Sequence, residues 1–214
     1  QDTRRFADFC RIPVFDPSSP EEAYKMIGEA FEYSEKYNTP VLFRPTTRVC
    51  HAYASIDNCD SPSPKKYEGF VKDSKKWVIF PRLSFANHIM IEKRNVEIGK
   101  DFSTYSANKA EGGNSEKAVV TSGISYAYTK ECLKDYPDVK LIKIATAYPF
   151  PEDFVLSSLD GAKEVLCIEE LSPFIEEQIL KLAGKHGLQL KVSGKLDGKV
   201  QAGGENSTDK IAAI

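Results

Sequence analysis

Four short apolar runs in the C-terminal part of the chain constrain the fold more than any other feature. They occupy residues 118–122, 141–145, 165–168 and 188–192. Helix signals separate them, because apolar residues at helical spacing fill Ile124–Cys132, Pro149–Pro151 starts a short helix, and Ser172-Pro173 opens a longer one. Alternating strands and helices favour a parallel sheet with helices on both faces. We therefore expect a three-layer α/β domain over residues 115–214.

The N-terminal part predicts a smaller unit of strand, helix and strand over residues 1–55. Ile12–Phe15 is a short apolar run, and Ser19-Pro20 with Glu22 is typical of a capped helix start. The helix ends before Pro40, and Val41–Arg44 follows as the second strand. This unit is too small to enclose a core by itself.

Residues 56–114 are expected to connect the two parts. Asp57–Pro64 is rich in turn-forming residues and predicts a loop, Trp77–Pro81 predicts an extended segment, and Ser84–Tyr105 predicts a helix. The polar stretch Ala110–Asn114 then ends the connection.

Composition excludes several classes of protein. The 214 residues carry a net charge of −2, which gives no basic footprint for nucleic acid or an anionic membrane. No apolar run approaches the ~20 residues that span a bilayer. The five cysteines are odd in number and show no metal-binding spacing, which favours a reducing, cytoplasmic protein without zinc or iron–sulfur ligation by this segment.

Polar side chains gather where the strand Val41–Arg44 ends. Pro45 cannot donate to a sheet ladder and closes the strand, and strand ends of this kind face the ligand crevice in open α/β sheets. The guanidinium of Arg48 suits a carboxylate or phosphate, and the imidazole of His51 exchanges protons near neutral pH. With Thr46 and Thr47, they either orient an anionic substrate or cofactor or hold a domain or subunit interface.

Two further groups of polar residues follow strands. Thr121–Ser125 is either an anion-binding turn or a plain strand-to-helix turn. The carboxylates of Glu169, Glu170, Glu176 and Glu177 suit acid–base or metal chemistry, but acidic groups beside a helix N-terminus are also favoured by the helix dipole alone. We favour the structural interpretation for both groups.

Five stretches carry a resemblance to a known family, namely Gln1–Ala7, Pro17–Tyr24, Pro40–His51, Val120–Tyr126 and Ile168–Glu177. In order and spacing they resemble the alpha subunit of indolepyruvate:ferredoxin oxidoreductase, of the thiamine-diphosphate-dependent 2-oxo acid:ferredoxin oxidoreductases. The resemblance implies oxidative decarboxylation of aryl 2-oxo acids to acyl-CoA, with ferredoxin as electron acceptor and a beta subunit as partner. It implies thiamine diphosphate with Mg²⁺ and iron–sulfur clusters in the complete protein.

The resemblance also assigns the parts of the chain. Residues 1–55 would be the last part of a pyrimidine-binding domain, and residues 115–214 would resemble the transketolase C-terminal domain. Residues 56–114 would connect these two domains. Arg48 and His51 are then candidate catalytic residues, and Thr46 and Thr47 are candidate cofactor-binding residues. No metal ligand is expected.

Several parts that the family needs are missing from this sequence. It contains no Gly-Asp-Gly motif for Mg²⁺ and diphosphate, no cluster-ligating cysteines, and no start methionine. We therefore expect an internal fragment that alone neither binds thiamine diphosphate tightly nor turns over. We expect it to form a homodimer through Trp77–Phe80 or the Ser84–Tyr105 helix, because surfaces that meet absent domains would be exposed. The alternatives are a non-catalytic α/β interaction or assembly module, and a subunit of a pyruvate or branched-chain 2-oxo acid enzyme.

Overall fold

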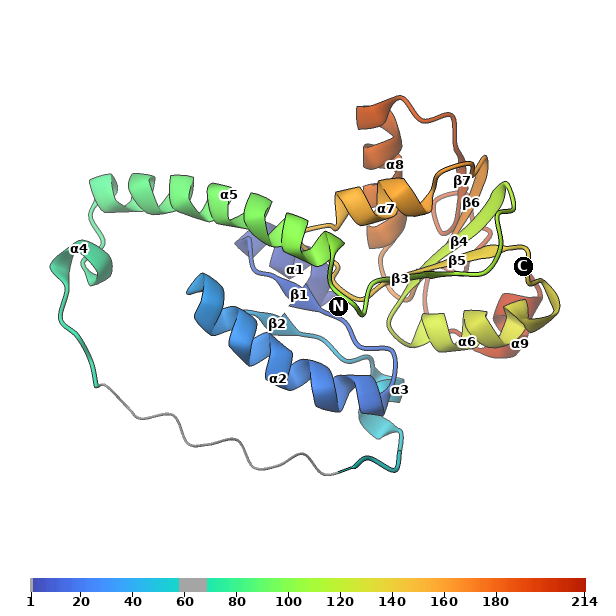
Figure 1. The fold of residues 1–214 in the computed structure, drawn as a ribbon, viewed down its shortest axis with the longest axis horizontal. Coiled ribbons are helices and arrows are strands. Elements are labelled where there is room, and N and C mark those ends of the chain that lie inside the picture. The colour runs from blue at the N-terminus through green and yellow to red at the C-terminus, as the bar shows by residue number, and fades with distance from the viewer. Residues whose placement is uncertain (1, 58–68) are drawn as a thin grey trace.

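The computed structural model describes residues 2–57 and 69–214, which form a five-stranded sheet and a two-stranded sheet with helices around them (Figure 1). The larger sheet has the order β3-β5-β4-β6-β7. Neighbouring strands in it are parallel except at β3, which pairs antiparallel with β5. The strands are β3 (Lys109–Glu111), β4 (Lys117–Ser122), β5 (Lys140–Ile144), β6 (Glu164–Ile168) and β7 (Lys191–Ser193). The predicted mostly parallel sheet is confirmed.

Helices cover both faces of this sheet, so the predicted three layers are confirmed. Figure 1 shows α7 (Glu152–Ser158) and α8 (Phe174–His186) on one face, and α6 (Ile124–Cys132) and α9 (Thr208–Ala212) on the other. A 3-10 turn, Leu133–Asp135, follows α6. The strands alternate between two cores. Val120, Ile142 and Cys167 pack toward α8, whereas Val119, Leu141 and Ile168 pack with Ile211 of α9.

The N-terminal part forms the predicted strand–helix–strand unit. β1 (Val14–Phe15) pairs in parallel with β2 (Leu42–Phe43), and α2 (Pro20–Tyr37) connects them. Ser19 caps α2 by accepting from the backbone N–H of Glu22 at 3.2 Å. The Glu22 carboxylate accepts from the N–H and hydroxyl of Ser18 (2.7 and 2.8 Å), so the predicted capping box is shifted by one residue. Two short helices flank this unit, α1 (Thr3–Cys10) and α3 (Thr47–His51).

The connecting residues differ from their prediction in two places. Trp77 ends the short helix α4 (Ser74–Trp77) and Pro81 begins the next helix, so the predicted extended segment Trp77–Pro81 is wrong at both of its ends. α5 (Pro81–Ser103) begins before Ser84, because Pro81 occupies the first helical position, where its missing N–H costs nothing. The predicted loop Asp57–Pro64 lies outside the described residues apart from Asp57. The predicted domain boundaries stay predictions.

Three smaller boundaries also differ. The polar stretch Ala110–Asn114 was expected to lack regular structure, but Ala110 and Glu111 lie in β3, where they pair with the edge of β5. β7 begins at Lys191 instead of Leu188. α8 continues through Gly184 and ends at Gly187, whose φ of 65° gives the left-handed cap that glycine favours.

Backbone hydrogen bonds join the two sheets. The N–H of Val14 donates to the carbonyl of Tyr148, and that of Asp16 to the carbonyl of Ala145, both at 2.7 Å. Asn108 supports the same corner, since its carboxamide oxygen accepts from Ala145 N–H at 2.7 Å. Its amide nitrogen donates to the carbonyl of Phe102 at 2.7 Å. The end of β5 is thereby tied to both β1 and α5.

Replacing Asn108 by Ala is expected to lower the free energy of unfolding by about 2–4 kcal/mol, because the Ala145 N–H loses its hydrogen-bond acceptor and the Phe102 carbonyl loses one of its donors. Urea denaturation followed by far-ultraviolet circular dichroism measures this. Asn114→Ala is the matched control, since Asn114 is exposed, and should cost less than about 0.5 kcal/mol. Equal losses in the two variants would contradict the role given to Asn108.

Candidate functional site

The strand order puts a topological switch point, the place where open α/β sheets form a ligand crevice, at the carboxyl ends of β4 and β6. β4 lies between β5 and β6 in the sheet, so the chain leaves β4 toward α6 on one face and leaves β6 toward α8 on the other. Ligands of open α/β sheets bind at such a switch point. Ser122 ends β4 and Glu169 directly follows β6, so these two side chains border the crevice.

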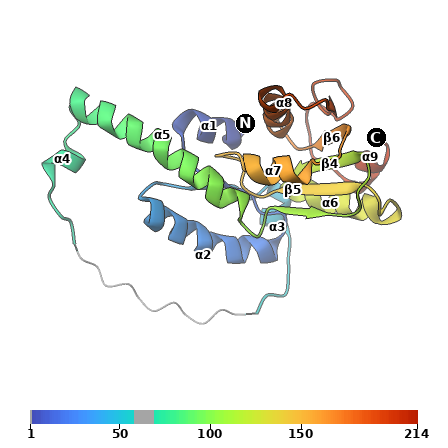
Figure 2. The same cartoon turned by 45° about the horizontal axis from the view of Figure 1, so that its top comes forward.

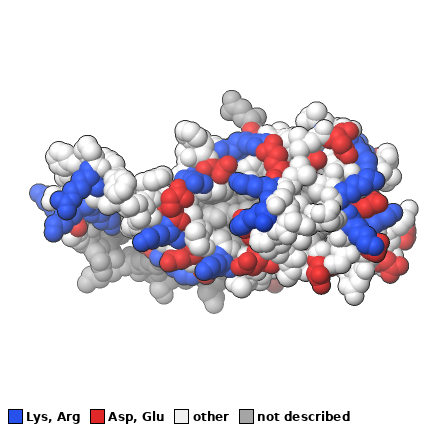
Figure 3. All heavy atoms as spheres, turned by 90° about the horizontal axis from the view of Figure 1, so that it is seen from above, with Lys and Arg blue, Asp and Glu red and all other residues white. Residues whose placement is uncertain are grey.

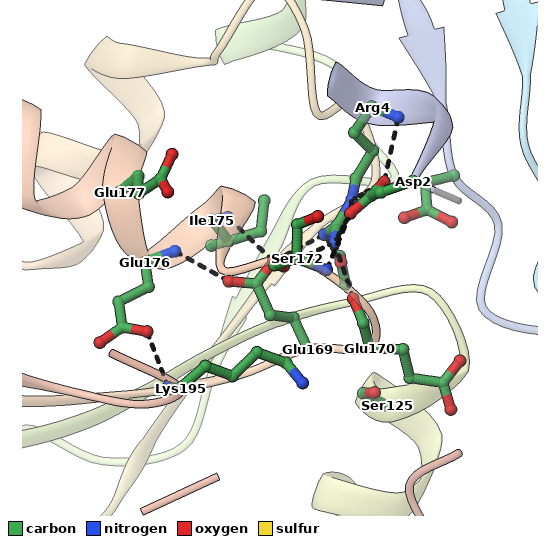
Figure 4. Close-up of polar contacts among 12 residues, drawn as sticks. Asp2, Arg4, Ser125, Glu169, Glu170, Ser172, Ile175, Glu176, Glu177 and Lys195 are labelled. Atoms are coloured by element: carbon green, nitrogen blue, oxygen red, sulfur yellow. Dashed lines mark hydrogen bonds and ion pairs between the residues drawn. The ribbon is translucent and has the colours of Figure 1, made fainter. Parts of the chain in front are cut away.

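The guanidinium of Arg4, from α1, fills this crevice (Figure 4). Its Nη1 donates to Glu169 Oε2 at 2.7 Å and lies 3.5 Å from the Ser122 hydroxyl. Its Nη2 donates to the carbonyls of Glu170 (2.8 Å) and Ser172 (3.1 Å). The Arg4 side chain has no exposed surface. The position where many α/β proteins bind a ligand is therefore occupied by a side chain of this chain.

Asp2 holds Arg4 from the other side. Its carboxylate accepts from Nη2 at 2.7 Å and from Nε at 3.0 Å, and it also caps α1 through the N–H of Arg4. It accepts a further bond from the N–H of Ser172 at 3.1 Å. Burial acts to raise the pKa of Asp2, but the hydrogen bonds and charge of Arg4, with the charge of Arg44, outweigh it and lower that pKa to about 2.

Glu169 and Glu176 hold backbone N–H groups. Glu169 accepts from the N–H groups of Ile175 (2.9 Å) and Glu176 (3.0 Å), the first turn of α8. Burial raises the pKa of Glu169, and the charge of Arg4 opposes that shift. The Glu176 carboxylate accepts from the N–H of Lys195 at 2.7 Å. These contacts favour the structural interpretation of the carboxylates over acid–base or metal chemistry.

A second buried charge pair adjoins the crevice. Arg44 Nη1 donates to Asp16 Oδ2 at 2.9 Å, and Asp16 is fully buried. Burial raises the pKa of Asp16, and the charge of Arg44 opposes the shift. Within the described residues, Asp16 Oδ1 and Thr46 Oγ1 have no hydrogen-bond partner. A Cβ at Gly123 would lie 3.0 Å from the Thr46 methyl group and 3.1 Å from Asp16 Oδ1, and Gly123 has a φ of 54°. Glycine is therefore favoured at the predicted strand-to-helix turn, because any other residue would be strained and tightly packed there.

The four predicted site residues separate in the structure. Thr46 is buried at the N-terminus of α3, whereas Thr47, Arg48 and His51 lie exposed on that helix. Arg48 pairs with Glu205 at 2.7 Å on the loop that precedes α9. The stretch thus points one side chain inward and three outward.

Asp2, Arg4, Asp16 and Arg44 were not predicted as site residues. Asp2 and Arg4 look like an ordinary helix cap followed by a surface charge. Arg44 belongs to the polar group at the end of its strand, but the site candidates in that group were Thr46, Thr47, Arg48 and His51. One signal in the sequence does point to this pair. Asp16 and Arg44 each directly follow an apolar strand, and charged residues are seldom buried unless they are paired.

A separate cleft of about 650 Å³ lies between the N-terminus of α2 and α6. Lys143 borders it from β5, nearly buried, and forms an ion pair with Glu22. Burial lowers the pKa of Lys143, and Glu22 opposes the shift. Lys130, on the rim, pairs with Glu111 at 2.6 Å. Since these cations have carboxylate partners, the cleft offers little surplus charge to an anion.

The described residues contain neither a metal-binding cluster nor a membrane-spanning helix. In residues 2–57 and 69–214, no cluster of three or more His, Cys, Asp and Glu side chains is arranged to hold a metal ion. None of the helices in that part of the chain combines the length and apolarity needed to cross a bilayer.

Replacing Arg4 by Met is expected to lower the free energy of unfolding by about 3–5 kcal/mol, because Glu169 would stay buried without its cation. Arg5→Met is the matched control. Arg5 is 43% exposed and pairs with Glu177 at the surface, so its loss should cost less than about 1 kcal/mol. Urea denaturation near neutral pH distinguishes the two, and similar losses would contradict the role of Arg4.

The lowered pKa of Asp2 predicts a pH dependence of stability. In the folded chain Asp2 stays ionised down to a pKa of about 2, below its ordinary 3.8, so the unfolded state binds its proton first as the pH falls. The contribution of Asp2 to the free energy of unfolding is therefore fully present above about pH 4 and is lost as the pH falls toward 2. Asp2→Asn should cost about 2 kcal/mol at neutral pH and flatten the stability curve between about pH 4 and 2.

Urea denaturation at a series of pH values measures this effect. Asp8→Asn is the control on the same helix, since Asp8 is exposed, and should change stability by less than about 0.5 kcal/mol at neutral pH. An Asp2→Asn variant with an unchanged pH profile would contradict the prediction.

Comparison with known proteins gives one consistent set of sequence relatives. The chain is 36% identical over 203 residues to the "Indolepyruvate oxidoreductase subunit IorA" of Thermococcus kodakarensis, covering 91% of this chain and 31% of that subunit. The subunits of the same name from Pyrococcus horikoshii and Methanothermobacter thermautotrophicus are 34% and 35% identical, over 91% and 92% of this chain and 31% and 32% of theirs. No protein-family profile matches the chain.

Among solved structures, the chain aligns with one described as "Split gene transketolase, inactive beta4 tetramer", with a TM-score of 0.49 and 11% identity. That alignment covers 95% of this chain and 55% of the other. The sequence matches extend over almost the whole chain and share one name. The chain is therefore related in sequence to the IorA subunits of indolepyruvate oxidoreductases, as its motifs predicted, and it spans about a third of their length.

Proposed function

We propose that this chain forms part of a subunit of an enzyme that oxidatively decarboxylates aryl 2-oxo acids, indolepyruvate among them, to acyl-CoA and passes the electrons to ferredoxin. The observation that carries the proposal is the identity of 34–36% to three IorA subunits over at least 91% of this chain. In the complete enzyme we expect thiamine diphosphate with Mg²⁺, iron–sulfur clusters and a beta subunit, in the cytoplasm.

The part of the reaction that this chain supports is the binding of an anionic group. Thr47, Arg48 and His51 are exposed on α3 and present hydroxyl, guanidinium and imidazole groups to whatever lies opposite. Such donors suit the carboxylate of a 2-oxo acid or the diphosphate of the cofactor. They do not fit the Mg²⁺ that accompanies the diphosphate, because Mg²⁺ prefers carboxylate, carbonyl and water oxygens.

The buried charges have a different role in this proposal. Arg4 fills the crevice of the larger sheet, so that crevice is not available to a substrate. This observation also favours the second candidate, a non-catalytic α/β module for interaction or assembly. We therefore assign the interior network to holding the two sheets together, and only α3 to contact with a ligand.

The complete subunit, produced with its partner subunit, tests the proposal through reduction of ferredoxin. Indolepyruvate should be oxidised with a kcat/KM at least about tenfold higher than pyruvate or a branched-chain 2-oxo acid. The reverse order would support the rival substrate classes, and the absence of any 2-oxo acid oxidation would support the non-catalytic module. The isolated 214-residue chain should show no micromolar affinity for thiamine diphosphate in calorimetry.

In that assay, Arg48→Ala and His51→Ala should each lower kcat/KM by about tenfold or more, because an anion loses a charged or hydrogen-bonding partner. Glu205→Ala is the matched control. It removes the surface partner of Arg48 at 2.7 Å but leaves the guanidinium in place. If Glu205→Ala causes the same loss as Arg48→Ala, Arg48 acts through that ion pair and not on a ligand.

A further inference from the structure

An arm of residues 69–90 projects from the body of the protein. It consists of an extended segment, α4 and the N-terminal half of α5, and Figures 1 and 2 show it reaching beyond the two sheets. The arm has local order of its own, since Phe70 packs on Trp77 with ring centroids 5.5 Å apart and Trp77 Nε1 donates to the carbonyl of Val71 at 3.0 Å. It is an ordered projection that lacks a covering surface.

Large apolar side chains on the arm face solvent. Ile79 is 80% exposed, and Phe80 and Phe85 are exposed to 66% and 69%. Contiguous apolar surface of this kind marks an interaction site in soluble proteins. The charges around it are mainly positive, as Figure 3 shows at the projecting end of the molecule. They are Lys72, Lys75, Lys76 and Arg82, against the single carboxylate of Asp73.

The arm extends away from the rest of the described chain. Glu92 and Arg94 are the first residues along α5 with a polar contact to the body, to Arg11 at 3.0 Å and to the Asn38 carbonyl at 3.1 Å. The helix is continuous from Pro81, so its rise of about 1.5 Å per residue carries Pro81 roughly 16 Å beyond Glu92. The described part of this chain therefore leaves the apolar side chains of the arm uncovered.

The outer face of α2 offers the complementary surface. Ile27 and Phe31 are exposed there, Phe31 to 70%, and Glu32 and Glu35 lie beside them at helical spacing, where no other described residue forms an ion pair with them. Gly28 is on the same face in mid-helix, where glycine costs about 1 kcal/mol relative to alanine. Nothing lies within 4 Å of the Cβ position at Gly28, so a neighbouring molecule can approach the helix backbone closely at this point.

We propose that two copies of this chain form a dimer by exchanging arms, with each arm lying along the outer face of α2 of the other copy. The apolar side chains of the arm meet Ile27 and Phe31, and its lysines meet Glu32 and Glu35. Under two-fold symmetry every contact occurs twice. Two arms double the contact area that one arm provides, toward the roughly 800 Å² per partner that a stable interface needs. The proposal does not depend on the reaction proposed above.

Sedimentation velocity of the 214-residue chain over a range of concentrations tests the proposal by reversal of charge. Glu32→Lys with Glu35→Lys on α2, and Lys75→Glu with Lys76→Glu on the arm, should each raise the dimer dissociation constant by roughly tenfold or more. The variant that combines all four changes restores opposite charges and should return to within about threefold of the original. Lys181→Glu is the control, because Lys181 is an exposed residue of α8, and it should leave the constant unchanged.

Ile79→Ser with Phe80→Ser provides a second, independent measurement, because these exposed side chains contribute little to folding but should be buried in the dimer. This variant should be monomeric while retaining the circular dichroism spectrum of the original chain. A chain that is monomeric at high concentration would overturn the proposal. So would a dimer that either charge reversal leaves unchanged, or one that the combined variant fails to restore.

Discussion

The buried ion pair between Arg4 and Glu169 is the contact on which the rest of the arrangement depends. The two residues are 165 positions apart, yet they join α1, the end of β6 and the start of α8. Removing both charges from water costs several kcal/mol, so such a pair is favourable only when further hydrogen bonds satisfy both groups. Here Asp2 and two carbonyls satisfy Arg4, and two N–H groups of α8 satisfy Glu169. The network therefore specifies one position for the N-terminal helix.

That network determines where a ligand has room to bind. A parallel sheet with this strand order has a crevice at the carboxyl ends of β4 and β6, which is the expected ligand position for the fold. Arg4 occupies it without leaving exposed surface. The predicted site residues Thr47, Arg48 and His51 lie elsewhere, exposed on α3, which follows β2 of the smaller sheet. The ligand position expected from the fold, at β4 and β6, and the site residues predicted from the sequence, on α3, thus lie in different parts of the structure.

The regular part of the fold could be predicted from the sequence, because its signals are local. The strands at 118–122 and 141–145 and the cap at Ser19 follow from apolar periodicity and turn residues within a few positions. β3 could not be predicted, because Lys109–Glu111 becomes a strand only through pairing with β5. Arg4 could not be predicted for the same reason, since a charge four residues from the chain start looks exposed until its distant partner is known. Long-range pairing decides both cases.

The N-terminus of α8 is capped by a residue other than its own N-cap residue. Its N-cap position is Pro173, whose side chain makes no capping hydrogen bond. Instead, the carboxylate of Glu169 accepts hydrogen bonds from two N–H groups in the first turn of α8, and Arg4 donates to that same carboxylate. Arg4 is fixed by Asp2, which lies 3.9 Å from Arg44, and Arg44 pairs with Asp16 beside Thr46. A continuous series of charges therefore runs from α8 through the closed crevice to the N-terminus of α3. Because α3 carries Arg48 and His51, the buried network determines the position of the one surface that presents them.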